Sequence, residues 1–152
     1  MGIRIENNQT KFKIEKHKIR GTVYRIFKIL GCKDKEISVF FTDDENIKKL
    51  NNKYLGKNKP TNVLSFSLRE GDYGDVNPQV MGDVVISVDT AQKDAEKGNL
   101  TFEQEIVFLL IHGILHLLGF NHENTSKEEA NEMRKKEKEL FNKINCRNKV
   151  FI

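Results

Sequence analysis

Three of the four histidines in the chain fall within residues 112–122, and their spacing could hold a metal ion. His112 and His116 are four residues apart, so on a helix their rings project from the same face. Gly119 can end that helix and let the chain reverse, which would bring His122 toward the same point. Three neutral imidazoles suit zinc, at about 2.0–2.1 Å per nitrogen, and leave a fourth position for water. We therefore predict one zinc ion held by His112, His116 and His122, with catalysis through the bound water.

The alternative is a set of core histidines that bind no metal. Two imidazoles in so apolar a segment would each need a hydrogen-bond partner, and few polar residues lie nearby in the sequence. Structural zinc sites normally close with a fourth Cys or His. His17 lies among lysines, where we expect it to be exposed, while Cys32 and Cys146 are isolated and expected to be reduced. These features favour an open metal site of the catalytic type.

The residue after the first histidine argues against a peptidase. In zinc peptidases with the H-E-x-x-H pattern, a glutamate at that position is the general base. This chain has Gly113, which has no side chain to take a proton. A glycine inside a helix costs about 1 kcal/mol relative to alanine. Gly113 therefore predicts a close approach to the helix backbone by a strand or by substrate.

The first two histidines require a helix to position them. Thr101 and Gln104 form a capping box that opens an apolar segment running to Leu118. This segment is hydrophobic on every side, which predicts a helix at the centre of the domain. The longest apolar stretch, from Ile106 to Phe120, is shorter than the roughly 20 residues of a membrane-spanning helix.

Four strands and four more helices are predicted from the hydrophobic periodicity. We predict a single α+β domain over residues 1–152, with a small mixed four-stranded sheet and about five helices, because strands and helices do not alternate strictly. In the helix that follows the second strand, we expect Thr42 and Glu45 to form a capping box and Tyr54 to face inward. The strands are expected at residues 2–6, 36–41, 62–68 and 82–88. Two of the other helices are expected at residues 11–30 and 89–97, and Ser126 with Glu129 is expected to cap a last helix.

A mild positive charge favours polyanionic partners. The net charge is +4 and the pI is about 9.0, and Lys49, Lys53, Lys57 and Lys59 fall within eleven residues. A solvated face with no ligand is the alternative for such a cluster. The first residues contain no apolar signal core, so we expect a cytoplasmic protein with no membrane partner.

Three segments resemble the motifs of a known family. The run from His112 to His122 closely resembles the signature of the YbeY family of bacterial endoribonucleases. The segments 59–66 and 82–87 are similar to two further motifs of that family, in the same order and spacing. The resemblance covers essentially the whole chain.

The resemblance implies a single-domain α+β fold with a zinc site at the floor of a basic cleft. It implies metal-dependent cleavage of single-stranded RNA, in 16S rRNA 3′-end maturation and ribosome quality control, with the small ribosomal subunit or its assembly factors as partners. By the same resemblance, the three histidines are the metal ligands. We predict that Lys53, Lys57, Lys59 and Thr61 contact the substrate backbone.

The chain also departs from the family pattern. Leu55 stands where the family usually has an arginine, Ser67 where proline is common, and Asn121 where an aspartate is usual. Ser65 and Asp83 are candidates for hydrogen-bonding near the metal, or else ordinary structural residues of their strands. A zinc-containing ribosome-assembly factor without catalytic activity is the second hypothesis, and a metallopeptidase is the third.

Overall fold

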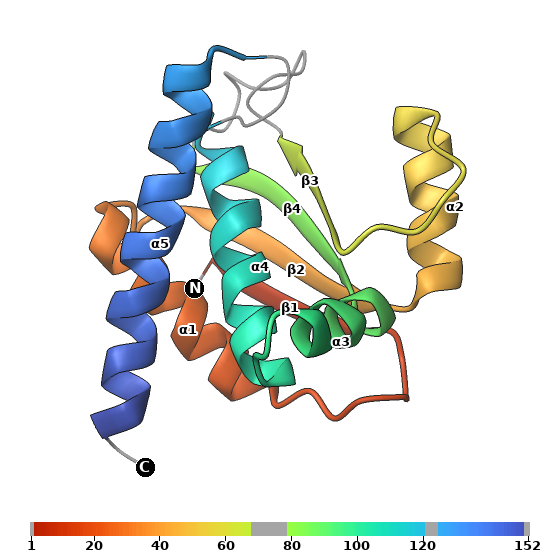
Figure 1. Ribbon diagram of the computed structural model, residues 1–152, viewed down its shortest axis with the longest axis horizontal. Coiled ribbons are helices and arrows are strands. Elements are labelled where there is room, and N and C mark those ends of the chain that lie inside the picture. Colours follow the sequence, from red (N-terminus) through yellow and green to blue (C-terminus); the bar gives the residue numbers. More distant parts are fainter. Residues whose placement is uncertain (1, 68–78, 121–124, 151–152) are drawn as a thin grey trace.

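The computed structural model describes residues 2–67, 79–120 and 125–150, with side chains up to residue 144. This part of the chain forms one four-stranded sheet and five helices (Figure 1). The α+β prediction is confirmed. The strands are β1 (Ile3–Asn7), β2 (Glu36–Thr42), β3 (Val63–Ser67) and β4 (Val80–Ser87). The helices are α1 (Lys16–Leu30), α2 (Asp44–Leu55), α3 (Val88–Lys97), α4 (Phe102–Leu117) and α5 (Lys127–Val150).

The sheet is mixed, with strand order β1-β2-β4-β3. Strands β1, β2 and β4 are parallel, and β3 runs antiparallel to β4. Among the described strands, β3 therefore pairs on one side only and forms an edge of the sheet.

Alternating side chains divide the sheet into two packed faces. Val39, Val84 and Ile86 belong to the main core, which α1, α4 and α5 complete. The neighbouring Leu64 and Val85 point to the other face, where they pack against Ile47 of α2. Helix α2 is accordingly set apart from α1, α4 and α5 (Figure 1).

Helix α4 lies at the centre of the main core, as its composition predicts. Leu110, Ile111, Ile114 and Leu115 are all fully buried. The burial of each such side chain contributes about 1.5–3 kcal/mol. The helix is apolar on every side because it packs against the sheet, α3 and α5 together.

Local sequence signals at several helix ends are confirmed. Thr101 and Gln104 form the predicted capping box of α4. Gly119 follows α4 with φ of 102°, in the region that favours glycine. The Ser126 hydroxyl accepts a hydrogen bond from the Glu129 amide at the start of α5.

The predicted start of the first helix is wrong by five residues. The helix begins at Lys16, with Glu15 in extended conformation at its N-cap. The Gln9 side chain donates to the Phe12 carbonyl and accepts from the Phe12 amide, so the preceding residues form a turn. Lys11 instead reaches Asp89 of α3, 2.9 Å away.

Two predictions for α2 are also wrong. Asp43, and not Thr42, caps the helix by accepting a hydrogen bond from the Asn46 amide at 2.9 Å. Thr42 is the last residue of β2 and is 5% exposed. Tyr54 does not face inward, because it is 56% exposed at the far end of the helix.

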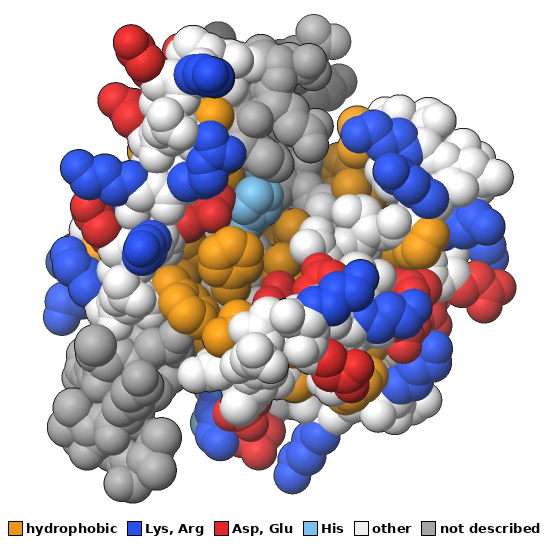
Figure 2. Space-filling model, in the orientation of Figure 1, with side chains coloured by type: hydrophobic (Ala, Val, Ile, Leu, Met, Phe, Trp, Pro, Cys, Tyr) orange, Lys and Arg blue, Asp and Glu red, His pale blue; other side chains and the backbone are white. Residues whose placement is uncertain are grey.

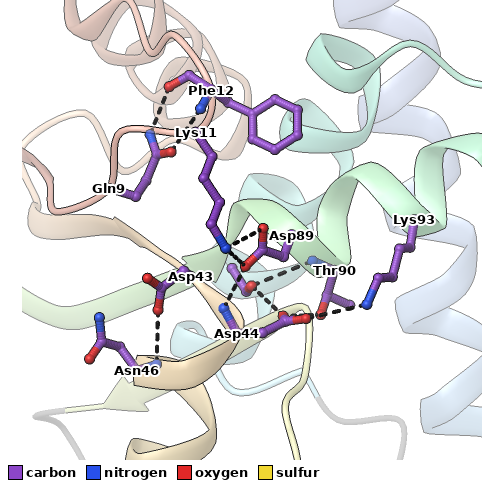
Figure 3. A network of polar contacts seen from close by, with 10 residues as sticks. Gln9, Lys11, Phe12, Asp43, Asp44, Asn46, Asp89, Thr90 and Lys93 are labelled. Atoms are coloured by element: carbon purple, nitrogen blue, oxygen red, sulfur yellow. Dashed lines mark hydrogen bonds and ion pairs between the residues drawn. The ribbon is translucent and has the colours of Figure 1, made fainter.

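Helix α2 is anchored at its N-terminus by Asp44 (Figure 3). The Asp44 carboxylate accepts hydrogen bonds from Ser87 at 2.7 Å and Thr90 at 2.5 Å, at the start of α3. Burial raises the pKa of this carboxyl, but these hydrogen bonds and Lys93 outweigh burial and hold the pKa below its usual value. The backbone amide of Asp44 in turn donates to Asp89. Helices α2 and α3 thus share one polar junction.

No single helix in the described ranges is both long and apolar enough to cross a membrane. Helices α3 and α4 meet that criterion only as a pair, and they are bent by 110° relative to each other.

Candidate metal centre

The histidine pair lies on the last turns of α4 with its ring nitrogens facing each other. The Nε2 atoms of His112 and His116 are 3.1 Å apart, and the ring centroids are 4.6 Å apart. Two nitrogens bound to one tetrahedral zinc at about 2.0–2.1 Å lie about 3.3 Å apart. The pair therefore fits a shared zinc ion with little movement. The predicted third ligand, His122, lies outside the described residues.

A carboxylate from α5 orients the first histidine. Glu137 Oε1 lies 2.7 Å from Nδ1 of His112, and Glu137 is 7% exposed. An ionised carboxylate only accepts, so Nδ1 carries the hydrogen and Nε2 presents its lone pair to the cleft. Metal-binding histidines usually have a hydrogen-bonding partner of this kind on the second ring nitrogen. The arrangement suits a metal ligand.

Glu137 is a residue of the candidate site that the sequence interpretation missed. It is 25 positions from His112 in the chain, so no local motif connects the two residues. One signal was available: Glu137 is four residues after Met133 and three before Leu140, on the buried face of its helix. An acidic residue on such a face requires a polar partner.

The histidines lie in an open cavity of about 480 Å³ between α4, β3 and the segment that follows α2. Figure 2 shows a histidine side chain near the middle of this face and several Lys and Arg side chains over α2. Three of the four predicted substrate-binding residues line the cavity: Lys57, Lys59 and Thr61. The fourth, Lys53, does not line it; its Nζ lies 5.2 Å from the centre of the Tyr54 ring.

Asn51 holds the lysine-bearing segment against α2. Its amide nitrogen donates to the Lys59 carbonyl at 2.9 Å, and the side chain is 2% exposed. Gly56 permits the left-handed turn that ends α2, with φ of 68°. These two residues direct Lys57 and Lys59 toward the cavity, and Leu55 also lines its rim.

Gly113 allows α4 to lie directly on the sheet. A Cβ atom at this position would lie 2.8 Å from Cγ1 of Val84 and 3.3 Å from the Ser65 hydroxyl. The Ser65 hydroxyl donates to the Gly113 carbonyl at 3.2 Å. The close approach predicted from the glycine is thus confirmed, and the neighbour is the sheet.

Asp83 lies away from the histidines, so hydrogen-bonding near the metal, one of its two interpretations, is wrong, and the other, an ordinary strand residue, holds. It is adjacent to Val84, which packs on α4, and successive strand residues point to opposite faces. Asp83 lines the grooves on the other face of the sheet, where burial raises the pKa of its carboxyl.

The remaining candidate residues have ordinary surroundings. His17 is 79% exposed and lies beside Glu15. Phe66 and Phe120 pack against the core, as expected for structural aromatic residues. Cys32 is a free thiol whose pKa is raised by burial, and the side chain of Cys146 is outside the described part.

Comparisons with known proteins identify the family of the chain. The profile of the Endoribonuclease YbeY family matches residues 4–145. The chain is 55% identical over 141 residues to Endoribonuclease YbeY of Syntrophus aciditrophicus, covering 93% of this chain and 88% of the relative. It is 45% identical to Endoribonuclease YbeY of Geobacter sulfurreducens, covering 93% and 94% of the two chains. The solution structure of a Thermotoga maritima protein superposes with a TM-score of 0.61 at 28% identity, covering 95% of this chain and 93% of that one. The chain belongs to the Endoribonuclease YbeY family.

Proposed function

We propose that this protein is a zinc-dependent endoribonuclease that cleaves single-stranded RNA. The main observation in support is that the Nε2 atoms of His112 and His116 lie 3.1 Å apart in a cavity that Lys57 and Lys59 also line. Family membership makes RNA the substrate class. His112, His116 and His122 are the proposed zinc ligands, with His122 assigned from the sequence spacing alone.

In this proposal some residues position the metal ion and others bind the RNA. Zinc, when bound, supplies a Lewis acid for a phosphoryl oxygen and lowers the pKa of a water molecule that it binds. Glu137 holds the His112 ring in the orientation and tautomer that a ligand needs. Lys57 and Lys59 provide the positive charge that holds the phosphate backbone over the histidines.

We further propose that the substrate is the 3′ end of 16S rRNA and that the protein acts in the cytoplasm on the small ribosomal subunit or its assembly intermediates. Ribosome quality control is the cellular role consistent with that substrate. The support is the resemblance of the three sequence motifs and the basic rim of the cavity.

The test is cleavage of a 3′-extended small-subunit rRNA fragment by the zinc-loaded protein. We expect cuts within the single-stranded part, and none with a His116→Ala variant or with zinc removed by a chelator. A folded, zinc-replete protein that cuts neither the naked RNA nor assembling subunits would contradict the proposal.

A zinc-containing assembly factor without catalytic activity is the second candidate, and Leu55 at the cavity rim is the observation that favours it. A lysine nearby does not reproduce the paired hydrogen bonds that an arginine makes to phosphate. The two candidates differ in the effect of zinc removal. If zinc only held the fold, the metal-free protein would unfold, whereas a catalytic site on this core should leave it folded by circular dichroism. A metallopeptidase, the third hypothesis, would turn over casein.

A further inference from the structure

We propose that the outer edge of β3, with which no other described strand pairs, binds the bases of the RNA at Val63 and Ser65, while Lys57 and Lys59 bind its phosphates. This inference rests on the proposed function and specifies how the substrate lies in the cavity. It starts from the position of β3, an edge strand whose residues Val63, Leu64 and Ser65 line the same cavity as the two histidines.

The hydrogen-bonding pattern determines which backbone groups of β3 point away from β4. In an antiparallel pair, residues alternate between those that bond to the partner strand and those that do not. The Ser87 amide donates to the Asn62 carbonyl at 2.9 Å, one position before the pairing of Val63 with Ile86. The N–H and C=O groups of Leu64 and Phe66 therefore point toward β4, and those of Val63 and Ser65 point outward.

The outward groups need partners that both donate and accept. Each outward residue offers an N–H beside a C=O, and these pairs recur every second residue, about 6.6–6.8 Å apart. A phosphate only accepts hydrogen bonds, so the carbonyls would repel it. An unpaired base has both donors and acceptors on its Watson–Crick edge, which single-stranded RNA leaves accessible.

We assign the phosphates to the part of the cavity that carries positive charge. Lys57 and Lys59 line it from the segment that Asn51 fastens to α2. The Ser65 side chain is already used, because it donates to the Gly113 carbonyl. Strand β3 therefore presents backbone groups, with little dependence on base identity. A base-paired duplex would have no free Watson–Crick edges to offer, so the same geometry predicts a preference for single strands.

Amide hydrogen exchange measured by NMR tests this arrangement with a control inside the same strand. The ¹⁵N-labelled His116→Ala variant is saturated with an unstructured oligoribonucleotide. We expect exchange at the Val63 and Ser65 amides to slow about tenfold, while Leu64 and Phe66, already bonded to β4, change little. The duplex form of the same RNA and an unstructured peptide are the comparison ligands.

The outcomes separate this inference from the proposed function. If wild-type protein cleaves the RNA but the Val63 and Ser65 amides exchange as before, the edge does not bind bases and only the inference fails. Equal protection by duplex would also overturn the inference. If no RNA is bound or cleaved, both fail, and protection by the peptide alone would identify a peptide ligand.

A proline substitution provides an independent test. Ser65→Pro removes the outward N–H, and edge strands tolerate proline at such positions. Ser65→Ala is the matched control for the lost hydroxyl. We expect Ser65→Pro to bind the oligoribonucleotide about two- to tenfold more weakly than Ser65→Ala, as for one lost hydrogen bond. Equal affinities of the two folded variants would overturn the proposal. If the proline variant does not fold, the exchange experiment decides.

Discussion

Glu137 and Gly113 are the residues outside the proposed ligand set that most directly determine the geometry of the histidine pair. Glu137 controls the ring of His112 through a 2.7 Å hydrogen bond. Gly113 controls the separation of α4 from the sheet, because Val84 occupies the space that a Cβ atom would need. One residue acts on the orientation of a ligand and the other on the position of its helix.

Substitution of Glu137 by Gln should weaken zinc binding. A neutral amide still accepts a hydrogen bond but no longer raises the basicity of the imidazole, so we expect an affinity loss of about ten- to a hundredfold. Competition against a zinc chelator measures the loss. Glu139→Gln, at an exposed position on the same helix, is the control. Unchanged zinc affinity in Glu137→Gln would show that the carboxylate is merely structural.

Substitution of Gly113 by Ala should destabilise the protein although alanine is the better helix former. Overpacking against Val84 costs about 1–3 kcal/mol, which exceeds the roughly 1 kcal/mol gained from helix propensity. Urea denaturation measures the difference in free energy of unfolding. Gly21→Ala is the matched control in α1, where a Cβ would meet nothing within 4 Å; it should stabilise the protein. An increase in the free energy of unfolding in both variants would contradict the close packing of Gly113 against Val84.

At the scale of elements, α2 and the segment after it form the basic side of the cavity. The helix is tied to α3 through Asp44 at one end, and Asn51 fixes the lysine segment near the other. Among the clustered lysines, Lys57 and Lys59 line the cavity and Lys53 does not. Position on this element, more than the number of lysines, should decide which of them contact RNA.

The double variant Lys57→Ala/Lys59→Ala should bind single-stranded RNA more weakly and with less dependence on salt. Each lost phosphate contact lowers the slope of log K against log salt by about 0.7 for a single strand. Fluorescence anisotropy over a series of salt concentrations measures the slope. Lys53→Ala should keep the wild-type slope. An equal reduction of the slope in that variant would mean that lining the cavity does not decide which lysines contact RNA.

At the scale of the whole molecule, one buried carboxyl makes stability depend on pH. Glu105 of α4 is 6% exposed. Burial, with a further contribution from Asp94, raises its pKa to about 6 from an ordinary value of 4.5. Between these values the folded protein binds more protons than the unfolded chain. Stability therefore falls as pH rises through this window and stays lower above it.

Glu105→Gln should remove the loss of stability that ionisation of Glu105 causes. We expect the variant to exceed the wild type in free energy of unfolding by up to about 2 kcal/mol at pH 8. At pH 4 the advantage should largely vanish, because the wild-type carboxyl is then protonated in the folded state. Denaturation curves at the two pH values, with exposed Glu103→Gln as control, make the comparison. An advantage of equal size at both pH values would contradict the ionisation argument.

The sequence by itself determined the features that depend on neighbours in the chain. The capping box of Thr101 and Gln104, the helical spacing of His112 and His116, and the left-handed Gly119 all involve residues within a few positions of one another. The apolar character of α4 likewise predicted its central position. Local signals of this kind were enough for the fold class and for the two described histidines of the proposed metal site.

Only the tertiary structure decided which distant side chains meet. It brought Glu137 to His112 and directed Lys57 and Lys59, but not Lys53, into the cavity. It also placed Asp83 on the opposite face of the sheet from the histidines. The physical reason is that these contacts depend on how α5, α2 and β4 pack, to within one residue of register or one turn of helix. Hydrophobic periodicity predicts that such elements form, but it does not specify their partners to that precision.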